Sequence, residues 1–189
     1  MTDKPDKTKW PEIRRQDRTV RDDQWIRDCL ARAPYGIWAT SVDGQPFTHV
    51  NTFLYDDSAH VVYLHSGLNG VSHRNVLAND RVCFCVAEAG RCLPGQTASA
   101  FSIEYASVII FGRASVVQDK TEARRALQML LDKYFPHLRP HEHYRNTTAE
   151  ELAATCVYRI EIDRWTAKRN EKSTDFPGAF PHGETPSAG

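Results

Sequence analysis

Short runs of apolar and β-branched residues, each bounded by residues that favour turns, recur along this chain. They predict six β-strands, at residues 35–42, 47–55, 60–65, 82–86, 105–117 and 155–163. An Asp43-Gly44 turn makes the first two strands a hairpin. The strand 105–117 is apolar on both faces, as a central strand would be, whereas the stretch 88–102 is rich in Gly, Pro and Ser and predicts a loop.

Other segments carry the signals of helices. Apolar residues at helical spacing predict helices over residues 21–33 and 120–134, and a shorter helix over 147–153. A further short helix, over 73–78, has Ser72 in position to cap it. Strands joined mostly by short turns, with helices between and before them, favour a mainly β (α+β) fold, an antiparallel β-barrel with flanking helices.

Composition limits the class of protein further. A length of 189 residues and 41% hydrophobic residues suit one domain, expected over residues 19–169, with flexible tails at 1–18 and 170–189. The 24 basic residues balance the 24 acidic ones, so we expect no nucleic-acid partner. No apolar run approaches the length of a membrane span and the N-terminus is charged, which predicts no membrane partner and a cytoplasmic protein.

Several kinds of chemistry find no support in the sequence. The five cysteines include no CxxC pair, so they do not predict a disulfide framework or a zinc site. His137, His141 and His143 lie in a segment interrupted by prolines, which gives no fixed geometry for a metal. The usual nucleotide-binding, metalloprotease and serine hydrolase motifs are missing, and we identify no catalytic residue.

One stretch does predict a binding site. A strand ending at His65 and Ser66 is followed by a turn with Gly67, Asn69 and Gly70. A helix then begins with residues 72–74, Ser-His-Arg. Backbone N–H groups, a hydroxyl and positive charge therefore converge, and this arrangement suits a phosphate. Ser72 is equally suited to be a plain helix cap, and His65 to be a histidine of the interior.

These motifs, taken in order, resemble a known family. The sequences VNTFLYD (50–56), YLHS (63–66), RVCF (81–84), KYFPHLRP (133–140) and VYRIEI (157–162) are similar to those of the pyridoxamine 5'-phosphate oxidase-like, FMN-binding split-barrel superfamily. The branch with nitroimidazole-resistance and flavin-nucleotide-binding proteins is the most similar. The resemblance spans about residues 36–169 and implies a six-stranded antiparallel split β-barrel. It also implies a homodimer with FMN in clefts between the subunits.

The resemblance also implies which residues contact FMN. His49, Val50 and Asn51 would face the flavin ring, while Leu64, His65 and Ser66 would border the ribityl chain and phosphate. The implied phosphate site and the segment that reaches the partner subunit's flavin comprise Ser72, His73, Arg74, Asn75, Trp165, Lys168 and Arg169. Relatives more often carry arginine at the position of His73, so Arg74 is the alternative cation. Trp165 could instead cover the end of the barrel.

The function that follows is FMN binding, with NAD(P)H as electron donor and a small nitroaromatic or quinone-like acceptor. The C-terminal arginine and histidine signature of true pyridoxamine phosphate oxidases is missing after Lys168, which argues against that activity. The alternatives are a non-catalytic FMN-binding or storage protein, and a split-barrel protein that uses deazaflavin F420 or haem.

Overall fold

A computed structural model describes residues 13–184 of the chain. The helices and strands are, in order, η1 (Gln16–Arg18), β1 (Thr19–Val20), α1 (Asp23–Arg32), β2 (Gly36–Val42), β3 (Gln45–Asn51), β4 (Phe53–Asp56), β5 (Val61–Gly67), α2 (Val71–Ala78), β6 (Arg81–Leu93), η2 (Ala98–Ala100), β7 (Ser102–Val116), α3 (Lys120–Tyr134), α4 (Ala149–Ala153), β8 (Thr155–Asn170) and β9 (Phe180–Pro181). No helix within 13–184 combines the length and apolarity needed to cross a membrane.

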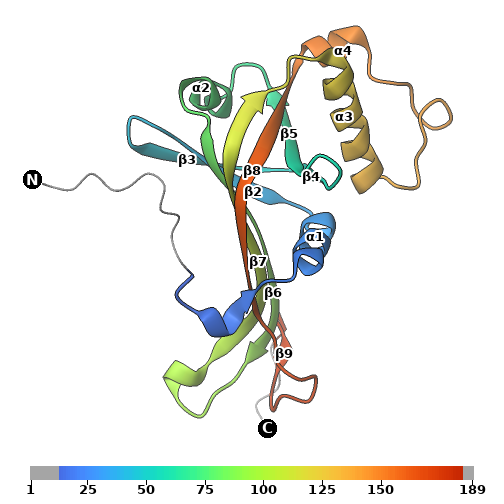
Figure 1. Cartoon of the computed structure of the whole chain (residues 1–189). Helices are drawn as coiled ribbons and strands as arrows, with labels where there is room; N and C mark the ends of the chain where they lie inside the picture. The colour runs from blue at the N-terminus through green and yellow to red at the C-terminus, as the bar shows by residue number, and fades with distance from the viewer. Residues whose placement is uncertain (1–12, 185–189) are drawn as a thin grey trace, which may run out of the picture.

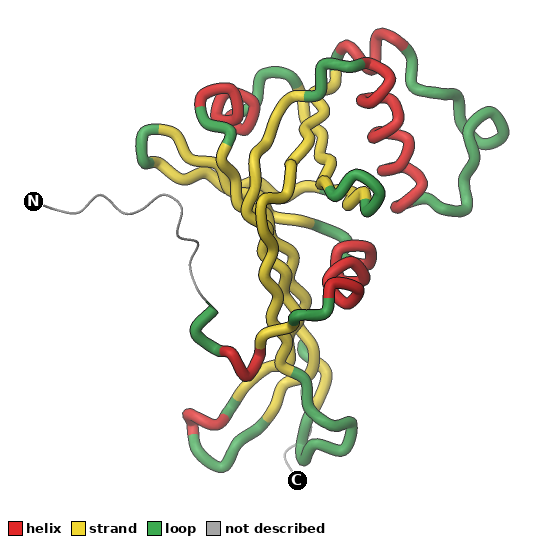
Figure 2. Tube along the Cα trace, viewed as in Figure 1, coloured by secondary structure: helices red, strands yellow, loops and turns green. Residues whose placement is uncertain are grey.

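The strands form one antiparallel sheet with the order β3-β2-β6-β7-β8-β5-β4, to which β1 and β9 add short pairings (Figure 1). The sheet does not close, because β3 and β4, at its two ends, are consecutive in the chain but do not pair with each other. Figure 2 shows the long strands continuing as a twisted ribbon beyond the helical part of the molecule. The antiparallel split-barrel prediction is thereby confirmed.

The β2–β3 hairpin follows directly from the local sequence. Asp43 and Gly44 adopt φ of 51° and 79°, the positive values that a two-residue hairpin turn requires. Val42 pairs with Gln45 across this turn, so the strands twist together without a loop. This register places alternate side chains of β2, such as Trp38, in the core.

The main core lies between the inner face of the sheet and α1. Asp22 caps α1 by accepting hydrogen bonds from the backbone N–H groups of Gln24 and Trp25. The helix buries Ile26, Cys29 and Leu30. They belong to a cluster that includes Trp38, Phe53, Leu64, Phe84, Val108, Ile110, Tyr158 and Ile160. Because α1 contributes three residues to this cluster, the helix is part of the main core of the barrel.

A smaller apolar cluster joins α3 and α4 to the other face of β5. Val61 and Tyr63 pack there with Ala123 and Ala126 of α3 and with Leu152 of α4. The strand β5 therefore has apolar neighbours on both faces: residues 62 and 64 face the main core, and residues 61 and 63 face α3. A strand buried on both sides reads as the continuous apolar run seen here.

The structure differs from the sequence prediction in four respects. Nine strands are present within residues 13–184 rather than six, because Thr52 separates β3 from β4 and the two short strands β1 and β9 pair at the lower end. The predicted loop 88–102 is largely strand, since β6 runs to Leu93 and β7 begins at Ser102. The last strand, β8, continues to Asn170 rather than ending near residue 163.

The fourth difference concerns the predicted C-terminal tail. Residues 170–184 are held against the sheet, because Arg91 donates hydrogen bonds to the carbonyls of Lys172, Ser173 and Thr174. Glu104 fixes that guanidinium through a bidentate ion pair at 2.7 Å, which lowers the pKa of Glu104 to about 2. Residues 1–12 and 185–189, which the tail predictions also covered, lie outside the described residues.

Lys133 of α3 is a charge placed among apolar groups. Its Nζ donates to the Leu30 carbonyl (3.2 Å) and lies 3.7 Å from the centre of the Phe53 ring. No carboxylate within residues 13–184 lies at ion-pair distance from it. Burial lowers the pKa of Lys133 from 10.5 to about 8. Below pH 8 the folded protein therefore keeps a charged ammonium group among apolar side chains, and this lowers the free energy of unfolding.

We predict that Lys133→Met stabilises the protein below pH 8. Between pH 8 and 10.5 the unfolded chain binds more protons at this position than the folded one, so the wild type gains stability as pH rises. The advantage of the variant should therefore shrink toward pH 10.5. Urea unfolding of both proteins at pH 7 and pH 10 measures it.

Lys133→Arg is the matched control, because a guanidinium stays charged throughout this range. It should therefore lack the gain in stability that the wild type shows between pH 7 and pH 10, and fall further below the wild type at pH 10 than at pH 7. An equal free-energy difference between Lys133→Met and wild type at pH 7 and pH 10 would contradict the assignment.

Candidate functional site

The predicted phosphate turn lies at the end of β5 and leads into α2. The N-cap of α2 is Gly70, with no side-chain cap, rather than Ser72. Ser72 lies inside the first turn, is buried, and contacts His49 Nδ1 through its hydroxyl (3.2 Å). The first N–H groups of α2 therefore have no side-chain acceptor, and Gly67 and Gly70 carry no Cβ that would obstruct an approach to them.

The two basic residues of this turn point in different directions. Arg74 is exposed, and its guanidinium reaches back to the carbonyl of Asn69 (3.4 Å). His73 instead turns inward, with Nδ1 3.3 Å from Cys156 Sγ and its ring against Tyr158. Arg74, the alternative named from the sequence, is thus the residue whose charge lies at the turn.

Other predicted residues hold the turn in place from within. Asn51 accepts a hydrogen bond from Trp38 Nε1 (3.2 Å) and donates one to the His65 carbonyl (3.0 Å). Ser66 Oγ lies 3.0 Å from the Tyr158 hydroxyl. Asn75 donates to Thr40 on β2, and Leu64 is fully buried in the core. The structure gives these side chains positioning roles, while their backbone borders the turn.

The side chain of His65 lies on the opposite face of β5 from those of Leu64 and Ser66. It faces a cavity of about 510 Å³ between β5, α3 and α4, which we call the His65 cavity. Its lining residues are Thr52, His65, Leu127, Leu130, Leu131, Tyr134, Phe135, Thr147, Glu151 and Thr155. Burial lowers the pKa of His65, and its Nδ1 is buried without a hydrogen-bond partner.

The His65 cavity and the phosphate turn are neighbours. Thr155, which lines the cavity, pairs with Gly67, the first residue of the turn. Tyr134 fixes the far wall, because its hydroxyl accepts from the Phe53 N–H (3.0 Å) and donates to the Pro34 carbonyl (2.9 Å). The predicted phosphate turn therefore adjoins a largely apolar cavity.

Sequence reasoning did not identify this cavity. Helical spacing predicted that the apolar residues of α3 share one side, but not that Leu127, Leu130, Leu131 and Tyr134 would line a cavity. The signal that could have revealed the cavity is the length of the apolar side of α3. It extends past the sheet and is continued by Phe135, which is 48% exposed.

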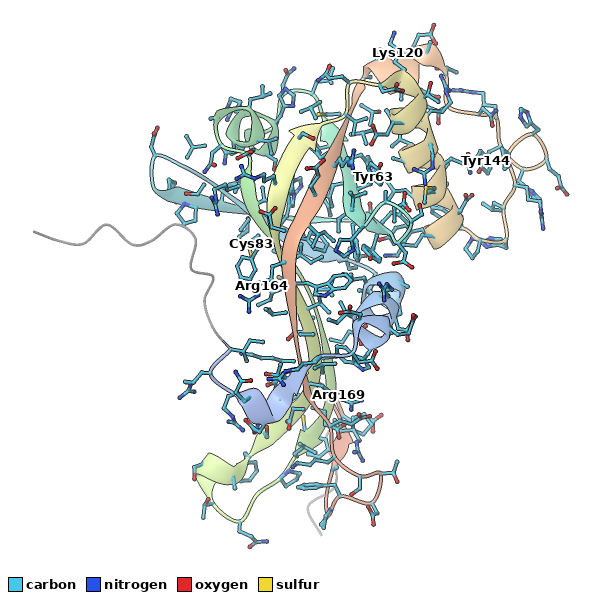
Figure 3. The ribbon with its side chains drawn as sticks, in the orientation of Figure 1. Tyr63, Cys83, Lys120, Tyr144, Arg164 and Arg169 are labelled. Atoms are coloured by element: carbon cyan, nitrogen blue, oxygen red, sulfur yellow. The ribbon has the colours of Figure 1, made fainter. Side chains whose placement is uncertain are left out.

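Val50 lies apart from His49 and Asn51, on the other face of the sheet. The register places it in one row with Ile37, Cys85 and Ile109, which we call the outer sheet face. Val50, Ile37 and Ile109 are 58%, 42% and 36% exposed. Figure 3 shows Cys83 and Arg164, from the next row, on the side of the sheet facing away from α1. Lys168 belongs to this side as well, opposite Ser107.

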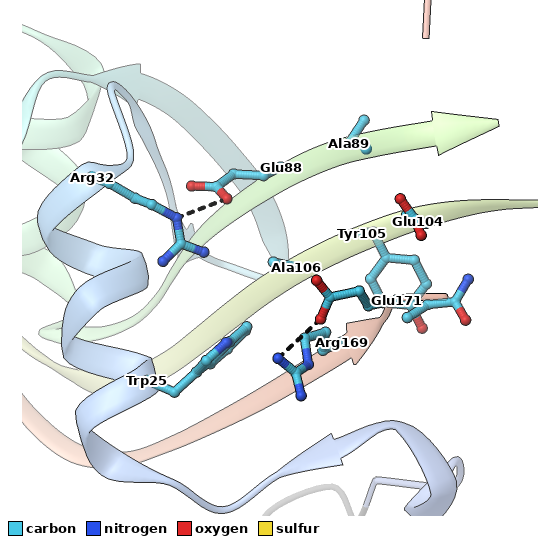
Figure 4. A pocket seen from close by; sticks show the side chains of 11 residues that line it. Trp25, Arg32, Glu88, Ala89, Glu104, Tyr105, Ala106, Arg169 and Glu171 are labelled. Carbon is cyan, nitrogen blue, oxygen red and sulfur yellow. Dashed lines mark hydrogen bonds and ion pairs between the residues drawn. The ribbon is translucent and has the colours of Figure 1, made fainter. Parts of the chain in front are cut away.

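Trp165 and Arg169 lie within β8 rather than beyond the last strand. Trp165 packs against Tyr55 and His60 and donates to Asp23, so in this chain it covers the barrel end. Arg169 pairs with Glu171 (3.0 Å) beside a hollow of about 230 Å³ near the end of α1 (Figure 4). Within the single chain Arg169 is not near the phosphate turn: Figure 3 places it in the lower half of the molecule, whereas α2 lies in the upper half.

The described residues form no group of three or more His, Cys, Asp and Glu side chains suited to a metal ion. His141 and His143 are exposed and make hydrogen bonds within their own loop.

The open antiparallel sheet and its strand order define a class of fold, the split β-barrels. Residues 22–169 match the sequence profile of the family described as pyridoxamine 5'-phosphate oxidase. The chain belongs to this family. The comparison with curated proteins gave no match.

Solved structures share the fold at low sequence identity. The flavocytochrome Anf3 from Azotobacter vinelandii is 21% identical, with a TM-score of 0.73, and the match covers 94% of this chain and 86% of that one. A FAD- and haem-binding protein from Mycobacterium smegmatis is 22% identical, with a TM-score of 0.72 and coverage of 82% and 74%. A candidate 5-nitroimidazole antibiotic resistance protein from Bacteroides thetaiotaomicron VPI-5482 is 19% identical, with a TM-score of 0.66 and coverage of 81% and 90%.

We predict that Asn51→Leu lowers the free energy of unfolding by about 2 kcal/mol, because it removes two hydrogen bonds and leaves the buried Trp38 N–H unpaired. Urea unfolding measures the change. Thr48→Ala, on the same strand but exposed, is the control and should have little effect. Equal effects of the two substitutions would show that the Asn51 bonds do not stabilise the fold.

Proposed function

We propose that this protein is a flavoprotein that binds FMN and passes electrons from a nicotinamide donor to a small organic acceptor. The observation that carries the proposal is the phosphate turn beside the His65 cavity. The turn offers a place for the nucleotide's phosphate, and the cavity next to it offers apolar walls for the acceptor. Membership of a family with flavin-binding relatives supports the same conclusion.

The residues of the turn suit a phosphate monoester. The N–H groups at the start of α2 lack side-chain acceptors, and the helix dipole places partial positive charge there. Arg74 adds a full charge that is free to move from the Asn69 carbonyl to a phosphate oxygen. Ser72, buried against His49, serves the helix interior and would act through its backbone.

The flavin would supply the redox chemistry, as cofactors of this kind do. The chain's own part would be to bind, orient and keep water away. Asn51 and Trp38 hold the backbone of β5 at His65, and Leu127, Leu131 and Tyr134 form the apolar side of the cavity. We assign no acid or base to the chain itself.

We propose further that the outer sheet face is the contact between two copies of the chain. The outer sheet face carries an exposed apolar row formed by Val50, Ile37 and Ile109. Such a row is unusual for a surface that faces water. A second copy would cover this row. The second copy would also bring the face of its sheet that carries Lys168 toward the first copy. The resemblance to the split-barrel superfamily implies such an arrangement for the flavin cleft.

Two measurements distinguish FMN from FAD, deazaflavin and haem. The two structures with the higher TM-scores reported above are described as a flavocytochrome and as a FAD- and haem-binding protein. The visible spectrum of the purified protein separates flavin, deazaflavin and haem, and mass spectrometry of the ligand released by denaturation separates FMN from FAD. We expect FMN, and turnover of NAD(P)H with an added quinone or nitroaromatic acceptor. A flavin-loaded protein without such turnover would support the storage alternative.

We predict that Arg74→Gln weakens FMN binding by about tenfold to a hundredfold, the effect of losing one charge-assisted hydrogen bond. Fluorescence titration of the apoprotein measures it. Arg14→Gln, at an exposed arginine near the N-terminus, should bind FMN like the wild type. Unchanged affinity in Arg74→Gln would remove this residue from the site.

We also predict that Ile109→Glu converts a dimer into a monomer, because the substitution would bury a carboxylate at the contact. Sedimentation equilibrium measures the mass. Leu77→Glu changes an equally apolar residue of α2 that is 68% exposed and outside the proposed contact, and it should leave the mass unchanged. A wild type that sediments as a monomer at micromolar concentration would rule the contact out.

A further inference from the structure

The His65 cavity contains one polar group whose hydrogen bonding is incomplete. Nδ1 of His65 is buried and has no partner, while the cavity lies along the same ring. Two other polar side chains around it, those of Thr155 and Glu151, have partners. Thr155 Oγ1 donates to the Glu151 carbonyl, and both carboxylate oxygens of Glu151 are held by Arg145 at 2.6 Å and 2.9 Å.

The missing partner of Nδ1 decides which ring nitrogen carries the proton. A neutral imidazole has one N–H and one acceptor nitrogen. A buried N–H without an acceptor is a rarer and costlier arrangement than a buried acceptor without a donor. The proton is therefore favoured on Nε2, and Nδ1 is left as the unpaired acceptor. His65 then presents a hydrogen-bond donor to the cavity.

The walls define the rest of the ligand. Five of the lining residues are Leu127, Leu130, Leu131, Tyr134 and Phe135, and Glu151 is the one charged residue among those described, already neutralised by Arg145. A charged ligand would lose its hydration here without gaining an opposite charge. The volume of about 510 Å³ is in the range of small-molecule sites.

We propose that the His65 cavity binds an uncharged, mainly apolar molecule with a carbonyl-type oxygen, of the quinone class, and that His65 Nε2–H donates a hydrogen bond to this oxygen. The assignment of this molecule as the electron acceptor rests on the proposed function. In that role the quinone takes up two electrons and two protons. A nicotinamide donor supplies the electrons and one proton as hydride, solvent supplies the second proton, and hydroquinone leaves.

Binding of menadione (2-methyl-1,4-naphthoquinone) to the purified protein, followed by calorimetry, tests the proposal. 2-Methylnaphthalene, which has the same rings without the oxygens, is the matched probe. His65→Phe should weaken menadione binding about tenfold, the effect of one hydrogen bond, and leave 2-methylnaphthalene unaffected. His65→Gln, whose amide can donate, should restore most of the menadione affinity. Equal menadione affinity in wild type and His65→Phe, or no binding to the wild type, would overturn the proposal.

Nitrogen-15 spectra of the histidines give a second measurement that needs no folded His65→Phe protein. The His65 signals, assigned by their loss in His65→Gln, should show protonated Nε2 and unprotonated Nδ1 at pH 7, and Nε2 should shift when menadione is added. Protonated Nδ1, or no shift, would overturn the proposal.

Flavin content, measured by absorbance on the same samples, separates this inference from the proposed function. A protein that carries flavin but shows no dependence of menadione binding on His65 would retain the proposed function and refute the inference. A protein without flavin that still binds menadione through His65 would do the reverse.

Discussion

The pairing of β5 with β8 is the constraint on which the site depends. Its register, from Val61 opposite Glu161 to Gly67 opposite Thr155, fixes the face on which each side chain of β5 lies. Leu64 is directed into the core, His65 into the cavity and Ser66 toward Tyr158, while Gly67 begins the turn at the cavity's edge. A slip of one residue would exchange these faces and place an imidazole in the core.

The apolar surface of the sheet is used in three different ways. The inner face is covered by α1 and forms the main core, and part of the opposite face of β5 is covered by α3 and α4. Two apolar surfaces are left over, the row of Val50, Ile37 and Ile109 and the walls of the His65 cavity. Because the molecule already has a well-packed core, these remaining surfaces support association with a second chain and with a small molecule, as proposed above.

Polar side chains inside the fold connect segments that the sheet alone would not hold. Asn51 joins β3 to Trp38 and to β5 across the opening of the split barrel. Tyr134 joins α3 to Phe53 and Pro34. Arg91 holds the segment after β8 by donating to its carbonyl groups, and Glu104 accepts a hydrogen bond from the Lys172 N–H. Each of these side chains bonds backbone atoms of a distant segment, at His65, at Phe53 and Pro34, and at residues 172–174, and so ties those segments to the sheet.

The sequence by itself determined the antiparallel strands, the helices α1 and α3, the Asp43-Gly44 hairpin and the glycine turn after β5, because strand alternation, helical spacing and glycine turns depend on near neighbours in the chain. Tertiary structure alone decided that Ser72 is buried against His49, that His73 turns toward Cys156, and that Val50 lies in one row with Ile37 and Ile109. It also decided that α3 overhangs β5 and leaves a cavity at His65. These features depend on which distant strands pair and in what register, and local patterns carry no information about either.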